Sequence, residues 1–398
     1  MGLQAVAFVE ASDGLADASV QPGRSGTLGG VTPVLPNARR GRLRTSTATV
    51  YALCERRELL LGVGPEATRE GEAVRAIVYT HYGPADVLQL KDVGKPTPGN
   101  DEVLVRLDAV SLNRSDWEGL TGEPFYARIG GLRRPRHQVL GSDIAGRVEA
   151  VGKDVQRFQP GDDVFGDILW HMGGFAEYVC AREKYLAKKP AGLTFEQVAA
   201  IPQAGAIALQ GIRDKGQVRK GQQVLINGAG GGGGMFAVQL AKLYGAEVTG
   251  VDRGDKLNFM RSLGADHVID YTREDFASTG KHYDLILDLV ARRSVFDCQR
   301  ALKPRGAYYA VGGPGATLLQ IALVGPVVGL LTGKKLRVLV VKPSVTDLLH
   351  LANLCEAGTI VPVIDWRFPL NETPAALRYV GEGHVKGKVV VTVGHVDT

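Results

Sequence analysis

The stretch that decides the fold is QVLINGAGGGGG, residues 223–234. Its first five residues are mostly aliphatic and predict a buried strand, and residues 235–244 carry the apolar spacing of a helix. Glycines at a strand-to-helix turn let the backbone approach a pyrophosphate closely, and the helix N-terminus favours the negative charge of that group. The loop contains an A-x-G-x-x-G pattern, and its candidate cofactor contacts are Ala229, Gly231, Gly232, Gly233 and Gly234.

Strand and helix patterns alternate after this loop, which predicts a doubly wound parallel sheet. We expect a helix at residues 256–263 and strands at 247–251, 267–270, 283–289 and 306–311. A flexible glycine linker is the alternative interpretation of the loop, but a strand and a helix flank it too closely for that.

The end of the second strand bears on which dinucleotide binds. Asp252 is placed to accept hydrogen bonds from the ribose hydroxyls of NAD, whereas Arg253 and Lys256 are suited to the 2′-phosphate of NADP. We favour NADPH/NADP, with NAD as the alternative. The other interpretation of Arg253 and Lys256 is a solvated helix start.

Composition narrows the class of protein. The chain has 398 residues, 22% of them charged, and a net charge of +5, which is too balanced over this length to indicate nucleic-acid binding. The four cysteines form no C-x-x-C pair, so the sequence favours a reducing, cytoplasmic setting. We expect no membrane span, because the nearest candidate, residues 318–331, is short and contains Gly325, Pro326 and Gly329.

The first 73 residues differ in composition from the rest. They contain eight arginines and no lysine, show little hydrophobic periodicity, and are predicted to be disordered. A transit peptide is disfavoured by Glu10, Asp13 and Asp17. A functional extension is the alternative, but we prefer a start-site artefact, because a strand-like run opens at Val74.

Between this segment and the parallel sheet, the chain is predicted to be mostly β. Residues 103–110 alternate between apolar and polar, as a half-buried strand does, and short strands bounded by glycine and proline follow through Tyr185.

With these pieces placed, residues 74–393 resemble the medium-chain dehydrogenase/reductase superfamily, in particular its zinc-independent quinone oxidoreductase branch, which includes zeta-crystallin. The motifs that carry the resemblance are NRSD (113–116), GSDIAG (141–146), GDDV (161–164), GGFAEY (173–178), PQAG (202–205), the glycine loop and LGADHVIDY (263–271).

The resemblance implies an α/β chain with two interleaved domains. A GroES-like, mostly β catalytic domain would comprise residues 74–194 and 341–398, and a Rossmann nucleotide domain would comprise residues 195–340. The active site would lie between the domains. Family members are often dimers joined through the edge of the nucleotide sheet, for which residues 336–341 are the candidate strand; an ordinary buried strand is the alternative.

The resemblance also implies a reaction without zinc. Zinc-dependent members carry a cysteine near Asn113 and a His-Glu pair where Ser142 and Asp143 stand, and this chain has neither. Hydride transfer without a metal is easiest onto a quinone or an α,β-unsaturated carbonyl. The candidate catalytic residues are Asn113, Asp116 and Tyr126.

Outside the loop, the resemblance adds Asn113, Gly205, Tyr271, Gly312 and Lys388 as candidate cofactor contacts; the last belongs to the closing loop, residues 384–388. We therefore expect an NADPH-dependent quinone or enone reductase acting on a small molecule. A metal-free alcohol or carbonyl dehydrogenase and a non-enzymatic cofactor-binding protein are the alternatives. An Asx-type turn is the alternative role for Asn113 and Asp116.

Overall fold

The computed structural model describes residues 72–128 and 131–394, so the expectations for residues 1–71 lie outside the described residues. The glycine loop belongs to a six-stranded parallel sheet with the strand order β10-β9-β8-β11-β12-β13. The strands are β8 (Gln223–Asn227), β9 (Glu247–Asp252), β10 (His267–Asp270), β11 (Tyr283–Asp288), β12 (Leu302–Ala310) and β13 (Lys335–Val338). This order is that of a Rossmann sheet, and it confirms the predicted doubly wound fold.

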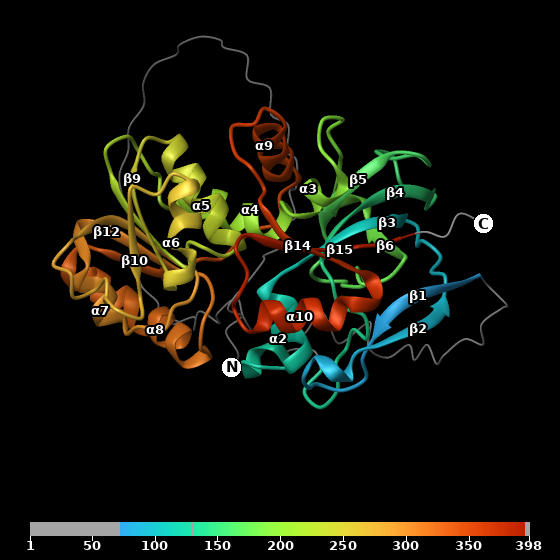
Figure 1. Ribbon diagram of the computed structural model, residues 1–398, viewed down its shortest axis with the longest axis horizontal. Helices are drawn as coiled ribbons and strands as arrows, with labels where there is room; N and C mark the ends of the chain where they lie inside the picture. Colours follow the sequence, from blue (N-terminus) through green and yellow to red (C-terminus); the bar gives the residue numbers. More distant parts are fainter. Residues whose placement is uncertain (1–71, 129–130, 395–398) are drawn as a thin grey trace, which may run out of the picture. The chain divides into compact units, whose positions relative to one another are not determined.

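Helices cover both faces of this sheet because its strands are apolar on both sides (Figure 1). Val224 and Ile226 of β8 pack in one core with α5 (Gly232–Leu243) and α6 (Leu257–Ser262), whereas Leu225 packs in another with α7 (Val295–Arg300) and α8 (Gly315–Thr332). Successive side chains of a strand point to opposite faces, which accounts for this division.

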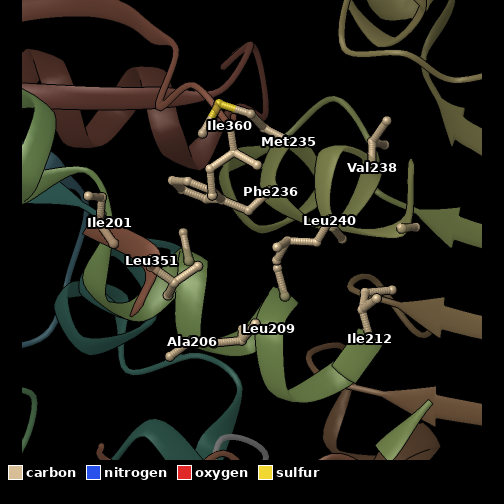
Figure 2. Packing of buried hydrophobic residues seen from close by; sticks show 14 of the residues in the cluster. Ile201, Ala206, Leu209, Ile212, Met235, Phe236, Val238, Leu240, Leu351 and Ile360 are labelled. Atoms are coloured by element: carbon tan, nitrogen blue, oxygen red, sulfur yellow. The ribbon is translucent and has the colours of Figure 1, made fainter. Parts of the chain in front are cut away.

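The first of these cores extends beyond the sheet to two more helices. Met235, Phe236 and Leu240 of α5 lie beside Leu209 of α4 (Pro202–Leu209) and Leu351 of α9 (Val345–Glu356), as Figure 2 shows. The glycine loop is thereby fixed from behind by a continuous apolar core.

A second, mixed sheet has the order β14-β15-β3-β4-β5-β7, with β6 also paired to β3. Its strands are β3 (Glu102–Leu112), β4 (Asp143–Val151), β5 (Asp163–Asp167), β6 (Tyr178–Arg182), β7 (Leu186–Lys188), β14 (Ile364–Pro369) and β15 (Lys388–Thr392). The predicted alternation in β3 is kept from Val105 to Ala109 but not at the start of the strand, where Val103 and Leu104 are both buried. β15 pairs antiparallel with β3, so the end of the chain completes a sheet begun near its start.

The remaining elements frame the two sheets. β1 (Ala73–Val78) and β2 (Gln89–Gly94) form a hairpin sheet of their own. The other helices are α2 (Arg114–Thr121), α3 (Phe195–Ala199) and α10 (Thr373–Gly381). The predicted domain boundaries at residues 194 and 341 stay a prediction.

The apolar segment predicted to be too short for a membrane span is longer than expected, and the absence of a membrane span stays a prediction. The helix α8 has 18 residues and a mean hydropathy of 1.8, so it is long and apolar enough to cross a bilayer by length and composition, and 22% of it is buried. The same helix connects β12 to β13, and Gly325 and Gly329 lie against the backbone of residues 334–336.

Candidate active site

The turn between β8 and α5 is shaped by glycines. A larger residue at these positions would strain the backbone or displace neighbouring atoms. Gly228 has a φ of +85°, which favours glycine, and its N–H donates to the carbonyl of Val251 at 2.9 Å. A Cβ at Gly234 would lie 2.2 Å from the Gly228 carbonyl oxygen and 2.5 Å from Cα of Ala229. Gly234 therefore permits the close packing of helix on strand.

The glycines in front of α5 are open to a ligand. A Cβ at Gly231, the N-cap of α5, would meet nothing closer than 3.6 Å, and no side chain caps the helix. The first-turn N–H groups of a helix have no partner within it, so they are available to an anion. At Gly232 a Cβ would lie 2.7 Å from Cδ of Lys388, and at Gly233 it would lie 3.4 Å from Leu289.

Asp252, at the end of the second strand, holds the glycine loop through hydrogen bonds. Its carboxylate accepts from the N–H of Gly230 at 2.9 Å and of Arg253 at 2.8 Å, and Nζ of Lys256 lies 3.5 Å away. Lys256 is buried over the loop, since a Cβ at Gly230 would lie 2.7 Å from its Cδ. The alternative of a solvated helix start is therefore wrong for Lys256, which compensates the charge of Asp252.

Two residues of the closing loop, His384 and Lys386, lie near Arg253 and Asp255, and the sequence prediction missed this arrangement. Arg253 forms an ion pair with Asp255 at 2.6 Å, and its Nη2 lies 3.2 Å from Nδ1 of His384. The pairing with Arg253, and more weakly the nearby Lys386, lower the pKa of Asp255 to about 2. Basic residues within the H-x-K-x-K run (384–388) were the only trace of this arrangement in the sequence.

The N-terminus of α2 presents Asn113 and conceals Asp116. The carboxylate of Asp116 is fully buried and accepts from the N–H groups of Asn113 at 2.7 Å and Gly141 at 3.1 Å. Asp116 therefore braces this turn. Burial raises the pKa of Asp116 to about 7, although both N–H groups and Lys388 act in the opposite direction.

Lys388 points its ammonium away from the glycine loop. Its Nζ donates to Oδ1 of Asn113 at 2.6 Å and to the carbonyl of Leu112 at 3.0 Å, and it lies 3.4 Å from Oδ2 of Asp143. The backbone N–H of Lys388 donates to Val363. Only the aliphatic stem of Lys388 therefore faces the loop, at Gly232.

The ammonium of Lys388 interacts electrostatically with a cluster of three buried carboxyl groups, which come from three elements. They belong to Asp116, Asp143 and Asp167. Asp143 and Asp167 are cross-strand partners on β4 and β5, so their side chains share a face of the sheet. Burial raises the pKa of all three carboxyl groups, and Lys388 acts against this rise in each. Burial also lowers the pKa of Lys388.

The remaining predicted residues lie at different distances from this centre. Tyr126 donates from its hydroxyl to the carbonyl of Gly313 at 3.3 Å, beyond the end of β12, and burial raises its pKa. Gly312 lies beside the carbonyl of Leu289 in the same turn region. Tyr271 is 51% exposed, and its N–H donates to the backbone carbonyl of Asp252.

Gly205 faces α9, and its contact with the cofactor stays a prediction. A Cβ there would lie 2.8 Å from Leu351 of α9, with Ile201 as the next neighbour. Its place in the structure is a close helix contact. Within residues 72–128 and 131–394, no group of three or more His, Cys, Asp or Glu side chains is arranged to hold a metal ion; zinc independence stays a prediction.

Comparisons with known proteins agree with this fold. Residues 99–191 match the model of the alcohol dehydrogenase GroES-like domain, and residues 263–391 match the model described as zinc-binding dehydrogenase. A chloroplast envelope quinone oxidoreductase homolog from Arabidopsis thaliana is 32% identical over 81% of this chain and 99% of its own length.

Two further similarities bear on activity. An NADPH-dependent alkenal/one oxidoreductase of Arabidopsis thaliana is 33% identical over 80% of this chain and 79% of its own. The solved quinone oxidoreductase of Coxiella burnetii superposes with a TM-score of 0.74 at 30% identity, covering 81% of this chain and all of that one.

Proposed function

Because the chain belongs to the medium-chain dehydrogenase/reductase superfamily, in its quinone oxidoreductase branch, we propose that it transfers a hydride from NADPH to a quinone or to the β-carbon of an α,β-unsaturated carbonyl. NADPH supplies the hydride when it is bound. The names of the relatives support both substrate classes, since they include quinone oxidoreductases and an alkenal/one oxidoreductase.

The turn between β8 and α5 is the observation that carries this proposal. The N-terminus of α5 has no side-chain cap, and the space in front of Gly231 is open to a phosphate. The aliphatic stem of Lys388 bounds this space at Gly232. The residues present therefore fit a dinucleotide pyrophosphate.

The preference for NADPH rests on charge at the end of β9. Lys256 compensates Asp252, so the carboxylate repels a 2′-phosphate less, while Arg253 and Lys386 add positive charge nearby. We expect Arg253→Ala to weaken binding of NADPH by about tenfold or more and to leave NADH unaffected, in keeping with a lost charged hydrogen bond. Equal losses for both cofactors would contradict this assignment.

We propose that Asn113 orients the reacting groups. Its side-chain oxygen is held by Lys388, so the amide can turn only its nitrogen toward a ligand. Holding reactants in a productive geometry is the main contribution of the protein when a cofactor supplies the chemistry.

The test follows the absorbance of NADPH with a panel of quinones, enones, aldehydes and alcohols. We expect turnover of quinones or enones. Turnover of only saturated alcohols with NAD would contradict the proposal and favour a metal-free alcohol dehydrogenase. Tight NADPH binding without turnover of any compound would favour a cofactor-binding protein without activity.

We also propose that the enzyme is a homodimer joined along β13 and α8. β13 is the last strand of its sheet in the described part of the chain, so its outer edge can pair with a second copy. Beside it, α8 exposes a row of large apolar side chains, two of them more than three-quarters exposed. These are Leu319, Leu323, Val327, Leu330 (86%) and Leu331 (80%).

Sedimentation of the purified protein tests this assembly. We expect a dimer, and a monomer for the double variant Leu323→Glu with Leu330→Glu, with NADPH affinity unchanged. A wild-type monomer that floats with phospholipid vesicles would overturn the proposal and assign the α8 face to a membrane. A cytoplasmic location, proposed from the cysteine pattern, is tested by cell fractionation.

A further inference from the structure

Gln203 occupies a position between the two helix N-termini that border Asn113. It is the second residue of α4, and its N–H donates to both carboxylate oxygens of Asp143, at 3.1 and 3.3 Å. Its side-chain oxygen accepts from the hydroxyl of Ser115, in the first turn of α2, at 2.9 Å. The amide of Gln203 is therefore fixed at the place where α2 and α4 meet.

The nitrogen of that amide has no acceptor. Gln203 is 4% exposed, and its Nε2 makes no hydrogen bond in the described residues. A carboxamide nitrogen carries two donors, and buried donors are nearly always paired. We therefore expect an acceptor that does not belong to the chain.

The surroundings of Gln203 link it to the cofactor loop. Asp143, which holds its backbone, also contacts Lys388, and the stem of Lys388 covers Gly232 in the first turn of α5. Asn113 is the other carboxamide held by this cluster, and its Nδ2 likewise makes no hydrogen bond of normal geometry. That nitrogen is nevertheless close enough to Asp143 to lower the pKa of the carboxyl. The amide nitrogen of Gln203 is therefore the one of the two without a competing acceptor in the described part of the chain.

We propose that Nε2 of Gln203 donates a hydrogen bond to the carbonyl oxygen of the substrate and stabilises the negative charge that this oxygen gains. This rests on the proposed function. Hydride addition forms a C–H bond at the β-carbon, the C=C electron pair shifts to form the enolate, and the carbonyl π pair moves to oxygen. The enolate then takes a proton from water, and the hydride donor leaves oxidised. In a quinone the same oxygen becomes a phenolate.

The partial charges of the site favour this role. The N-termini of α2 and α4 place positive ends of helix dipoles beside the amide. The ammonium of Lys388 and the N–H of Gln203 are already committed to Asp143. The side-chain amide of Gln203 is thus a donor left for an oxyanion, and a fixed donor of this kind typically contributes about 10²-fold to 10³-fold in kcat.

The test compares Gln203→Leu and Gln203→Glu with Gln156→Leu, an exposed matched control. In both Gln203 variants we expect kcat/KM for an enone to fall by about 10²-fold, with NADP affinity unchanged by calorimetry. The control should match the wild type. A circular dichroism spectrum and melting temperature establish that each variant is folded, and Gln203→Glu keeps the size of the side chain if Gln203→Leu does not fold.

A second readout needs no turnover. 4-Nitrophenolate, a planar oxyanion whose absorbance reports hydrogen bonding, is titrated into the protein saturated with NADP. We expect its affinity to fall at least tenfold in both Gln203 variants. Unchanged affinity and unchanged kcat/KM in a folded variant would overturn the proposal, and so would a tenfold loss of NADP affinity, which would place Gln203 on the cofactor. Failure of the proposed function shows separately, as a wild type that reduces no quinone or enone.

Discussion

Replacing Lys388 with methionine removes the positive charge that interacts with the buried carboxyl cluster. All three donors of this group are used: they reach Leu112, Asn113 and Asp143 at 2.6 to 3.4 Å. Lys388 is 2% exposed and Asp143 is fully buried, so water does not replace the lost partner. Methionine keeps the length and the apolar stem, which separates loss of charge from loss of packing.

The expected loss of unfolding free energy arises because the substitution leaves a buried charge unpaired. Removing one partner of a buried ion pair costs about 3–5 kcal/mol of unfolding free energy. Burial already raises the pKa of Asp143 above its unfolded value of 3.8, and loss of Lys388 raises that pKa further. A carboxyl whose folded pKa is raised loses stability as the pH rises through that pKa. The deficit of Lys388→Met should therefore be small at pH 5 and largest at pH 8.

Urea denaturation at pH 5 and pH 8, followed by tryptophan fluorescence, measures this deficit. The exposed Lys281→Met is the matched control and should change stability by less than about 0.5 kcal/mol. The double variant Lys388→Met with Asp143→Asn should recover about 1–3 kcal/mol, because the two sites are coupled. A deficit under about 1 kcal/mol at pH 8, or a deficit larger at pH 5, would refute the reasoning.

Four further predictions concern the loop and the predicted catalytic residues. Gly234→Ala, whose Cβ would lie 2.2 Å from the Gly228 oxygen, should lose about 1–3 kcal/mol by urea denaturation. Gly231→Asp should keep its stability yet abolish NADPH binding by calorimetry, because a charge would stand against the pyrophosphate. In Asp116→Asn, the fall in stability expected as pH rises through about 7 should disappear from the denaturation series. Tyr126→Phe should lower kcat by less than about tenfold, and a loss of 10² or more would identify a general acid.

The sequence was informative where structure is local. Residues 223–227 form the predicted strand, and the strands and helices after them lie within a few residues of their expected positions. The helix α5 begins at Gly232, three positions before the expected Met235, because glycines have no apolar periodicity to mark a helical turn. Its first turn is set by the loop geometry and by the core behind it.

The site was less predictable because its contacts join distant parts of the chain. Lys388 reaches Asn113 only because β15 pairs with β3, and the two residues are 275 positions apart. Sequence placed both residues near the cofactor but left the direction of the lysine unknown. Gln203 lies in a quoted motif, yet its free amide becomes visible only from what its oxygen and its backbone already bond.

Lys388 connects two parts of the site that are formed by separate segments. Its stem lies on Gly232, where a phosphate is expected, and its ammonium fixes the oxygen of Asn113, where the reacting carbon is expected. The missing Cβ of Gly232 therefore has two consequences, because it leaves room for the ligand and also for the stem. A methyl group there, 2.7 Å from Cδ of Lys388, would displace the lysine and release Asn113 without touching it. Tight cofactor binding and correct orientation of Asn113 thus depend on the same contact.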